Sequence, residues 1–384
     1  MEPLYLDHAA TTPLHPVVLQ RMMPYFLDQF GNPSSLHRFG QVARSAITES
    51  RDQIATLLGA SPRSVIFTSG GTESDNLALF GTAAGQPDKK HIVTTTIEHH
   101  AVLHACDRLE RLGYSVTRVS VDDRGSIRME ELERAIRSDT LMVSVMYANN
   151  EVGTIQPIEA IAQLTKQCGV LLHVDAVQAV GKLPIDFQNS GIDLMTVSAH
   201  KLNGPKGVGA LICSPQAQAK LVPTVYGGSQ ERKRRAGTEN VPGIVGFAAA
   251  LQLSINDLVH NQRHYSLLRE RMLERFEALL PHGSFVINGH PDQHLAHILN
   301  VSFPGLSTET LLMNIDLAGI AASSGSACTS GSHELSHVLL AMKRSKEVAS
   351  SAIRFSFGYG HTEQQIGEAA EKIATIVNRL RNTQ

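Results

Sequence analysis

The chain has 384 residues, of which 42% are hydrophobic and 18% charged, with a formal net charge of -2. This composition indicates a folded globular protein, and the near-neutral charge argues against direct, general binding to nucleic acid. The four cysteines form no CxxC pair, which argues against a structural zinc site or a disulfide scaffold and favours a reducing compartment. The first residues do not resemble a secretory signal. No apolar run reaches the roughly 18 residues of a membrane span, so we expect a cytoplasmic protein without a membrane partner.

Short β-branched runs alternate with longer amphipathic runs through the first two thirds of the chain. This alternation predicts an α/β fold with a mainly parallel sheet. Helices are expected near 41–58, 129–136 and 158–167. Sheets of this kind bind ligands at the carboxyl ends of their strands. The predicted strands are Val65–Thr68, Ile92–Thr96, Val116–Val119, Leu141–Met146, Leu171–Asp175, Leu194–Ser198 and Val208–Cys213.

The last third of the chain has a different pattern. A long helical stretch, with room for a break, runs from Ile244 to Leu280 and could join two domains whose boundary lies near residue 255. Strands are expected at Ile298–Phe303 and Ile353–Phe357. Thr362 followed by Gln365 predicts a capping box at the start of the C-terminal helix.

A lysine, Lys201, follows the strand that ends near Ser198 and precedes a turn with two glycines. A lysine held there could form a Schiff base if its pKa were lowered. Taken alone, the segment favours a simpler interpretation, a solvated lysine in a turn.

Asp175 ends an apolar strand, where a lone carboxylate needs a partner. A protonated pyridine nitrogen would be such a partner, and Gln178 could bond the phenolic oxygen of the same ring. The alternative is an aspartate that caps the next helix. With Lys201 at the end of a neighbouring strand, the cofactor interpretation is the better one.

Two further polar segments follow strands. The run from Thr68 to Ser74 opens a helix and predicts an anion site, although an ordinary glycine turn would look the same. The run matches neither the Walker A loop nor the GxGxxG motif, so it is not a nucleotide-binding fingerprint. His99 could stack on a cofactor ring and move protons, whereas the adjacent His100 is expected to point away. The chain has 18 histidines, most of which would be structural or exposed.

Together these segments resemble a known family. The motifs occur in the order and spacing of cysteine desulfurases, in the NifS/IscS-like branch of the fold-type I, aspartate-aminotransferase-like enzymes that use pyridoxal 5'-phosphate. Two departures are Ala199, where many relatives have glycine, and His100, where many have lysine. The shared motifs are DHAATTP, FGNPSSLH, TSGGTES, EHHAV, NNEVG, HVDAVQ, SAHKLNGPKG, RAGTEN, SSGSACTSGS and IRFSFG.

The resemblance implies a large pyridoxal-phosphate-binding domain over residues 15–255 and a small α+β domain from residues 1–14 and 256–384. It implies that Lys201 bonds the cofactor, that Asp175 and Gln178 contact its ring and that His99 stacks on it. The implied phosphate contacts are Gly71, Thr72, Ser198 and His200, with Thr238 supplied by the other subunit of a homodimer. Asn150 is implied as a cofactor and substrate contact, and Asn32 and Arg354 as contacts to the carboxylate of L-cysteine.

Cys328, in the Ser/Gly-rich run 323–332, is implied as the thiolate that accepts the sulfur, and a transient contact with an iron–sulfur cluster is compatible with that role. The resemblance implies alanine as the product and a sulfur-acceptor protein as partner, in iron–sulfur assembly or tRNA thiolation. The other three cysteines are expected to be packed. The run 231–235 is expected to be a solvated turn or a rim near the dimer interface. The alternatives are a selenocysteine lyase or some other pyridoxal-phosphate enzyme of the same fold, and a non-catalytic scaffold that carries sulfur.

Overall fold

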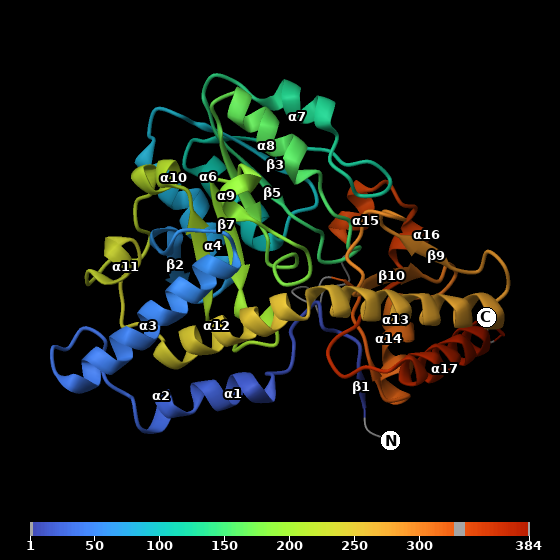
Figure 1. The fold of residues 1–384 in the computed structure, drawn as a ribbon. Coiled ribbons are helices and arrows are strands. Elements are labelled where there is room, and N and C mark those ends of the chain that lie inside the picture. The colour runs from blue at the N-terminus through green and yellow to red at the C-terminus, as the bar shows by residue number, and fades with distance from the viewer. Residues whose placement is uncertain (1–2, 326–334, 383–384) are drawn as a thin grey trace.

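The computed structural model describes residues 3–325 and 335–382, and its largest feature is a seven-stranded sheet (Figure 1). The strand order is β2-β8-β7-β6-β5-β3-β4. Only the pairs formed by β8 are antiparallel, so the expected mainly parallel sheet is confirmed. The strands are β2 (Val65–Thr68), β3 (His91–Thr95), β4 (Ser115–Val119), β5 (Thr140–Met146), β6 (Leu171–Asp175), β7 (Leu194–Ser198) and β8 (Gly209–Cys213).

Helices cover this sheet. The central strands are therefore buried along their whole length and expose no polar face. A long helix, α12, packs against α1 and α3. The helices of this part are α1 (Pro16–Met22), α2 (Pro24–Leu27), α3 (Arg38–Leu57), α4 (Gly71–Asn76), α5 (Thr82–Gly85), α6 (His100–Arg111), α7 (Met129–Ala135), α8 (Ile158–Gln167), α9 (Phe187–Ser190), α10 (Pro215–Lys220), α11 (Gln230–Lys233) and α12 (Val241–Asn256).

A second hydrophobic core forms around a three-stranded antiparallel sheet in the C-terminal part. The N-terminal strand β1 (Leu4–Tyr5) pairs with β11 (Ile320–Ala321), and Leu6 is buried in this core. The remaining elements are β9 (Val286–Asn288), β10 (Ile298–Ser302), β12 (Ala352–Ser356), α13 (Leu258–Leu279), α14 (Thr308–Leu317), α15 (His337–Ala341), α16 (Lys346–Ala349) and α17 (Glu363–Asn382).

The predicted helical stretch is indeed broken: α12 and α13 meet at Asp257 with a bend of 71° (Figure 1). In the part of the chain that the structure describes, no single helix is long and apolar enough to span a membrane, and only this bent pair meets that test by length and composition. The domain limits near residue 255 stay a prediction.

Two local predictions have clear outcomes. The capping box is confirmed, since the Gln365 amide N–H donates to Thr362 Oγ1 at 3.2 Å and the Thr362 amide N–H donates to Gln365 Oε1 at 3.0 Å. The expectation for the cysteines is wrong in one case. Cys106 and Cys213 are buried, but Cys168 is exposed because it lies just past the end of α8, outside the packed face of that helix.

Candidate active site

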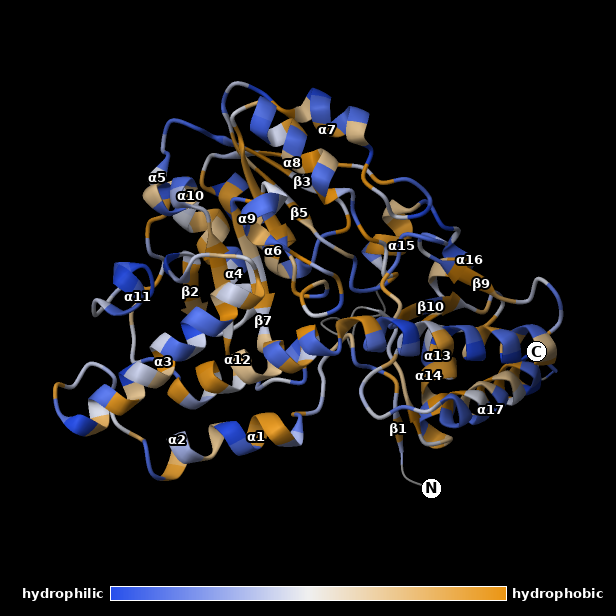
Figure 2. Cartoon of the chain, viewed as in Figure 1, coloured by the Kyte–Doolittle hydropathy of each residue, from blue (hydrophilic) through white to orange (hydrophobic). Residues whose placement is uncertain are grey.

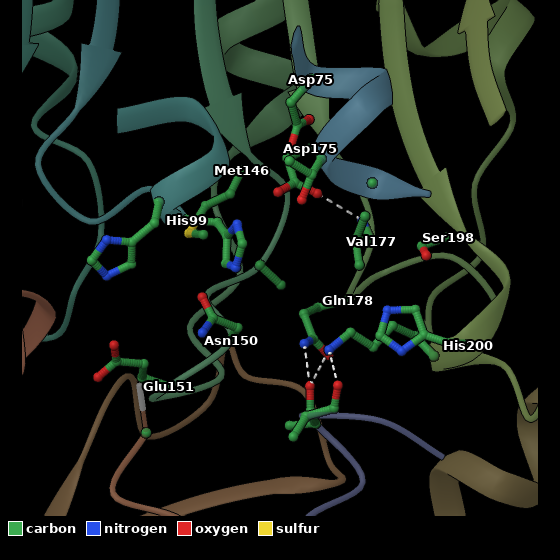
Figure 3. A pocket seen from close by; sticks show the side chains of 18 of the residues that line it. Asp75, His99, Met146, Asn150, Glu151, Asp175, Val177, Gln178, Ser198 and His200 are labelled. Carbon is green, nitrogen blue, oxygen red and sulfur yellow. Dashed lines mark hydrogen bonds between the residues drawn. The ribbon is translucent and has the colours of Figure 1, made fainter. Parts of the chain in front are cut away.

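A cavity of about 210 Å³ opens at the carboxyl edge of the large sheet (Figure 3). Its walls come from the segments that follow β2, β3, β5, β6 and β7, together with the N-terminal segment and β12. Most of the residues predicted from sequence line it, namely Gly71, Thr72, His99, Asn150, Asp175, Gln178, Ser198, His200, Lys201 and Arg354.

The N-terminal segment holds the lysine in place. Lys201, in the turn after β7, donates from Nζ to the carbonyl oxygens of Ala9 at 2.5 Å and Ala10 at 2.7 Å. Gln178 donates to the same Ala9 oxygen at 2.9 Å (Figure 3). These bonds fix the Lys201 amine at the wall of the cavity formed by the N-terminal segment.

Two carboxyl groups lie next to each other on the opposite side of the cavity (Figure 3). Asp175 accepts a hydrogen bond from the Val177 amide at 3.0 Å, and burial raises its pKa to about 6, opposed by that bond and by Lys201. Asp75 is 1% exposed, and burial, with the charge of Asp175, raises its pKa well above the usual range. Two buried carboxyl groups this close favour a single negative charge on the pair, and the Val177 bond and Lys201 favour placing it on Asp175.

His99 follows β3 and caps helix α6. Its Nδ1 accepts a hydrogen bond from the Ala101 amide at 3.1 Å, so the neutral ring carries its proton on Nε2. Burial, with a further contribution from Lys201, lowers the pKa of His99 to about 4. The ring points into the cavity as a neutral donor (Figure 3).

Polar groups that suit an anion gather at the start of α4. The Ser198 hydroxyl is buried and has no hydrogen-bond partner among the described residues. A Cβ on Gly71 would lie 2.9 Å from a methyl group of Val177, so the backbone approaches closely where a phosphate would bind the helix N–H groups. His200 completes this corner, and its Nδ1 lies 3.1 Å from Thr11 Oγ1.

Arg354, on β12, brings the second core to the cavity. It is 1% exposed, forms an ion pair with Asp7 at 2.7 Å and donates to the carbonyl oxygens of Asn150 at 2.8 Å and Gly325 at 2.7 Å. Its Nε has no partner among the described residues. A guanidinium placed this way suits a carboxylate ligand.

Three predicted site residues are not brought into this cavity. Asn32 lies on an exposed turn, where its Oδ1 accepts from the Ser34 amide at 2.9 Å. Thr238 is exposed beside a separate surface cavity of about 120 Å³. Cys328 lies outside the described residues. The roles of all three stay predictions.

The run 231–235 differs from the solvated turn that was expected, because part of it is buried and paired. Glu231 is buried and pairs with Arg51 at 2.6 Å, while Arg235 pairs with Glu73 at 2.8 Å beside the start of α4. The buried carboxylate also accepts from the Phe67 amide at 2.9 Å, which explains why the turn folds inward.

Several lining residues were missed by the sequence analysis: Asp75, Glu151, His337 and the carbonyl groups of Ala9 and Ala10. His100, expected to point away, also lines the cavity, with its ring 5.0 Å from that of His337. Asp75 directly follows the TSGGTES motif, and Glu151 lies within NNEVG. An acidic residue in or beside a motif was therefore the sequence signal for both.

A lysine and a buried carboxylate on opposite sides of a cavity, with an anion corner and a strand-end histidine, define a fold-type I enzyme that uses pyridoxal phosphate. The "Aminotransferase class-V" family model matches residues 4–368. The chain belongs to this family and, within it, to the cysteine desulfurases of the NifS/IscS-like branch.

The similarity to individual relatives extends over nearly the whole chain. "Putative cysteine desulfurase IscS 1" of Bacillus subtilis is 51% identical, over 99% of this chain and 100% of the relative. "Cysteine desulfurase IscS" of Methanosarcina thermophila is 46% identical, over 99% of this chain and 93% of the relative. A solved "NIFS-LIKE PROTEIN" has a TM-score of 0.92 at 37% identity, covering 98% of this chain and 100% of that one. The structure "SspA in complex with cysteine" has a TM-score of 0.81 at 35% identity, covering 92% and 98%.

We expect the variant Asp175→Asn to bind the cofactor but to lose most turnover, by about 10²- to 10³-fold, the effect of removing one partner of a buried charge pair. An amide cannot stabilise a protonated ring nitrogen. The measurement is turnover per bound cofactor, quantified by absorbance. Asp75→Asn, which replaces the neighbouring carboxyl whose pKa is raised well above its usual range, is the matched control with a smaller expected loss. Turnover near the wild-type value in fully loaded Asp175→Asn would contradict the assignment.

For Arg354 we expect the variant Arg354→Lys to raise the KM for L-cysteine about tenfold or more, with little change in bound cofactor. Lysine keeps a positive charge beside Asp7 but lacks the planar fork that bonds a carboxylate at two points. Titration of L-cysteine against the absorbance of the holoenzyme measures the dissociation constant. An unchanged constant, in a variant that melts at the wild-type temperature, would place the carboxylate contact elsewhere.

Proposed function

We propose that this pyridoxal-phosphate-dependent cysteine desulfurase moves the sulfur of L-cysteine onto Cys328 by means of Lys201, His99, Asp175 and Arg354. The observation that carries the proposal is that the last four of these side chains surround one cavity, in a chain whose relatives at up to 51% identity are desulfurases. The solved relative bound to cysteine supports the choice of substrate.

The residues present fit the cofactor. Asp175 would meet the ring nitrogen, Gln178 the phenolic oxygen and His99 the ring face. The unpartnered Ser198 hydroxyl, His200 and the backbone at Gly71 and Thr72 would hold the phosphate. When bound there, pyridoxal phosphate supplies an electron sink for the carbon atoms of the substrate.

The protein's own groups then divide the work. Arg354 binds the substrate carboxylate, with Asn150 beside it, and orients the Cα–H bond towards Lys201. Lys201 Nζ takes the Cα proton. The Cys328 thiolate forms an S–S bond to the substrate sulfur while the substrate Cβ–S bond breaks. The electron pair of that bond goes to Cβ, which is protonated, and the proton held by Lys201 returns to Cα, which gives alanine. His99 Nε2 is the group placed to move protons.

We propose that the active form is a homodimer. Hydrophobic residues recur along α1, α2 and the chain that leads into α3 (Figure 2). Eight of them have exposed side chains, and exposed apolar residues gathered in this way mark an interaction surface. Thr238 is exposed and does not line the active-site cavity of its own subunit. A residue that contacts the cofactor of a second subunit would lie this way. The exposed apolar residues are Val17, Leu19, Met23, Phe26, Leu27, Phe30, Leu36 and Phe39.

The homodimer is tested by a charge placed in this surface. Phe30 is 67% exposed and stacks on Phe39 at 5.7 Å. We expect Phe30→Glu to lower the mass measured by light scattering from twice 41.6 kDa towards 41.6 kDa, because a buried, unpaired carboxylate opposes association. Leu317→Glu, at an 85% exposed site on α14, is the control and should stay dimeric. A monomeric wild type would overturn the proposal.

We further propose a cytoplasmic location, because a thiol that carries sulfur must stay reduced between turnovers, and a sulfur-acceptor protein from iron–sulfur assembly or tRNA thiolation. The test is to load the protein with labelled L-cysteine and offer candidate acceptors. Equimolar alanine and acceptor-bound sulfur are expected. Release of pyruvate in place of alanine would rule out the desulfurase reaction.

A further inference from the structure

A second and larger cavity lies at the junction of α12 and α13. This junction cavity has a volume of about 580 Å³ and is walled by the turn 181–183, the first turns of α13 and the segment 294–297 before β10. Its volume falls in the range of small-molecule sites. It shares no lining residue with the active-site cavity, and the desulfurase reaction proposed above does not use it.

Three polar side chains that line the junction cavity have no hydrogen-bond or ion-pair partner within residues 3–325 and 335–382. Tyr265 is 4% exposed, His297 is 3% exposed, and Lys182 is half-buried. Among the described residues, none makes a hydrogen bond or ion pair with these side chains. Their ring contacts are those of the Lys182 ammonium, 5.3 Å from the Tyr265 ring centroid, and of the Tyr265 ring with the His297 and His264 rings, each 6.1 Å away. Their polar atoms are not among the fully buried atoms that lack a partner, so they face the open space of the cavity, where a ligand would bond them.

The charges of these groups select an anion. Burial lowers the pKa of Lys182 to about 8, which leaves an ammonium at neutral pH. Burial holds the pKa of His297 well below its usual range and raises that of Tyr265 to about 12, so both are neutral hydrogen-bond donors. Arg263 adds a second cation, and Glu270 is the only acid among the described residues that line the cavity.

Part of the remaining wall is apolar, and Asn261, Gln262, Ser266 and His294 are its other polar residues. Leu183, Leu258, Leu267 and Ala296 line the cavity beside the Tyr265 ring. A bare inorganic ion would leave this surface wet, whereas an acid with a small apolar body would cover it.

We propose that the junction cavity is a binding site for a small organic acid, whose anionic group meets Lys182, Tyr265 and His297 and whose apolar body packs on the leucines. This site is separate from the substrate site at Arg354 and independent of the desulfurase reaction. The titratable and charged groups around Lys182 are Tyr265, His297, Arg263, Glu270 and His294 on the same wall, and His8 nearby. His297 also lies within the electrostatic reach of Arg354 and Lys201.

The test is calorimetric titration of the cofactor-loaded enzyme with benzoate, at constant ionic strength, with neutral benzamide as the isosteric control. We expect one benzoate per chain and no binding of benzamide. Lys182→Gln should weaken binding about tenfold or more, and Tyr265→Phe, which removes only the hydroxyl, should weaken it several-fold. Lys166→Gln on α8, an exposed lysine away from the cavity, should change nothing.

A proton count separates this site from loose surface binding. An anion beside Lys182 favours the ammonium and raises its pKa, so binding near pH 8 should take up a fraction of a proton, measured by comparing buffers of different ionisation enthalpy. This uptake should disappear in Lys182→Gln. Benzoate binding that is lost in Arg354→Lys but kept in Lys182→Gln and Tyr265→Phe would place the acid in the substrate site and overturn the proposal. Absence of binding at millimolar benzoate would also overturn it and leave Lys182 as a structural partner of the Tyr265 ring. If Lys182→Gln does not fold, the benzoate affinity of Tyr265→Phe tests the proposal, and an affinity equal to that of the wild type would overturn it.

Discussion

Lys201→Ala is expected to abolish turnover and to remove the visible absorbance of the lysine-bound cofactor. The reason is geometric: the Lys201 amine is held by two backbone carbonyl groups on the wall of the cavity that faces Asp175, and no other described lysine lines that cavity. Borohydride reduction of the wild type followed by peptide mapping measures the attachment point directly.

A matched control for Lys201→Ala exists in the same turn. Lys206 is exposed five residues further on, and Lys206→Ala should keep both absorbance and turnover. Recovery of the reduced cofactor on a peptide that contains Lys206 but lacks Lys201 would refute the assignment. Loss of absorbance in both variants would indicate that the turn, rather than one amine, is needed for binding.

The sequence predicted the strand ends well because they carry a local signal. Asp175 and Ser198 are the last residues of β6 and β7, as the change from apolar to polar residues indicates. In parallel strands those ends share one edge, so residues that follow different strands meet there without any long-range information. The resemblance to a family then assigned roles that spacing alone left open.

The parts that sequence could not give depend on long-range packing. The Ala9 carbonyl that receives Lys201 is a backbone group far away in the chain, and no side chain marks it. The pKa of Asp75 is raised by its burial and then by Asp175, which the end of β6 places beside it. The turn at Glu231 was predicted to be solvated, because a run of charges gives no sign of the buried partner Arg51 on α3.

The N-terminal segment shows how the two cores share one site. Asp7 pairs with Arg354 on the small sheet, while Ala9 and Ala10 bind Lys201 at the edge of the large sheet. A few consecutive residues therefore place the proposed carboxylate contact and the proposed cofactor lysine relative to each other. A displacement of this segment would disturb both, which makes it more sensitive to substitution than its terminal position suggests.

Cys328→Ser is expected to keep the fold, the proposed dimer and the bound cofactor but to form no persulfide. Cys328 is outside the described residues, and the bonds described for Lys201, Asp175 and Arg354 go to Ala9, Ala10, Val177, Asp7, Asn150 and Gly325. A serine hydroxyl is a far weaker nucleophile than a thiolate at neutral pH, so the substrate Cβ–S bond should stay intact. The variant should still bind L-cysteine, as judged by the change in cofactor absorbance.

Intact mass after brief exposure to L-cysteine distinguishes the outcomes. The wild type should gain the mass of one or more sulfur atoms on the peptide that contains Cys328, reversibly on reduction, and Cys328→Ser should gain none. Cys168→Ser is the matched control, since Cys168 is an exposed thiol whose loss should leave the sulfur on Cys328. If Cys328→Ser made alanine at the wild-type rate, the persulfide route would be wrong and a lyase acting on selenocysteine or cysteine would replace it. If the wild type carried the sulfur on Cys168, the cavity would still be that of a pyridoxal-phosphate enzyme, but the acceptor thiol would be one that the family resemblance does not imply.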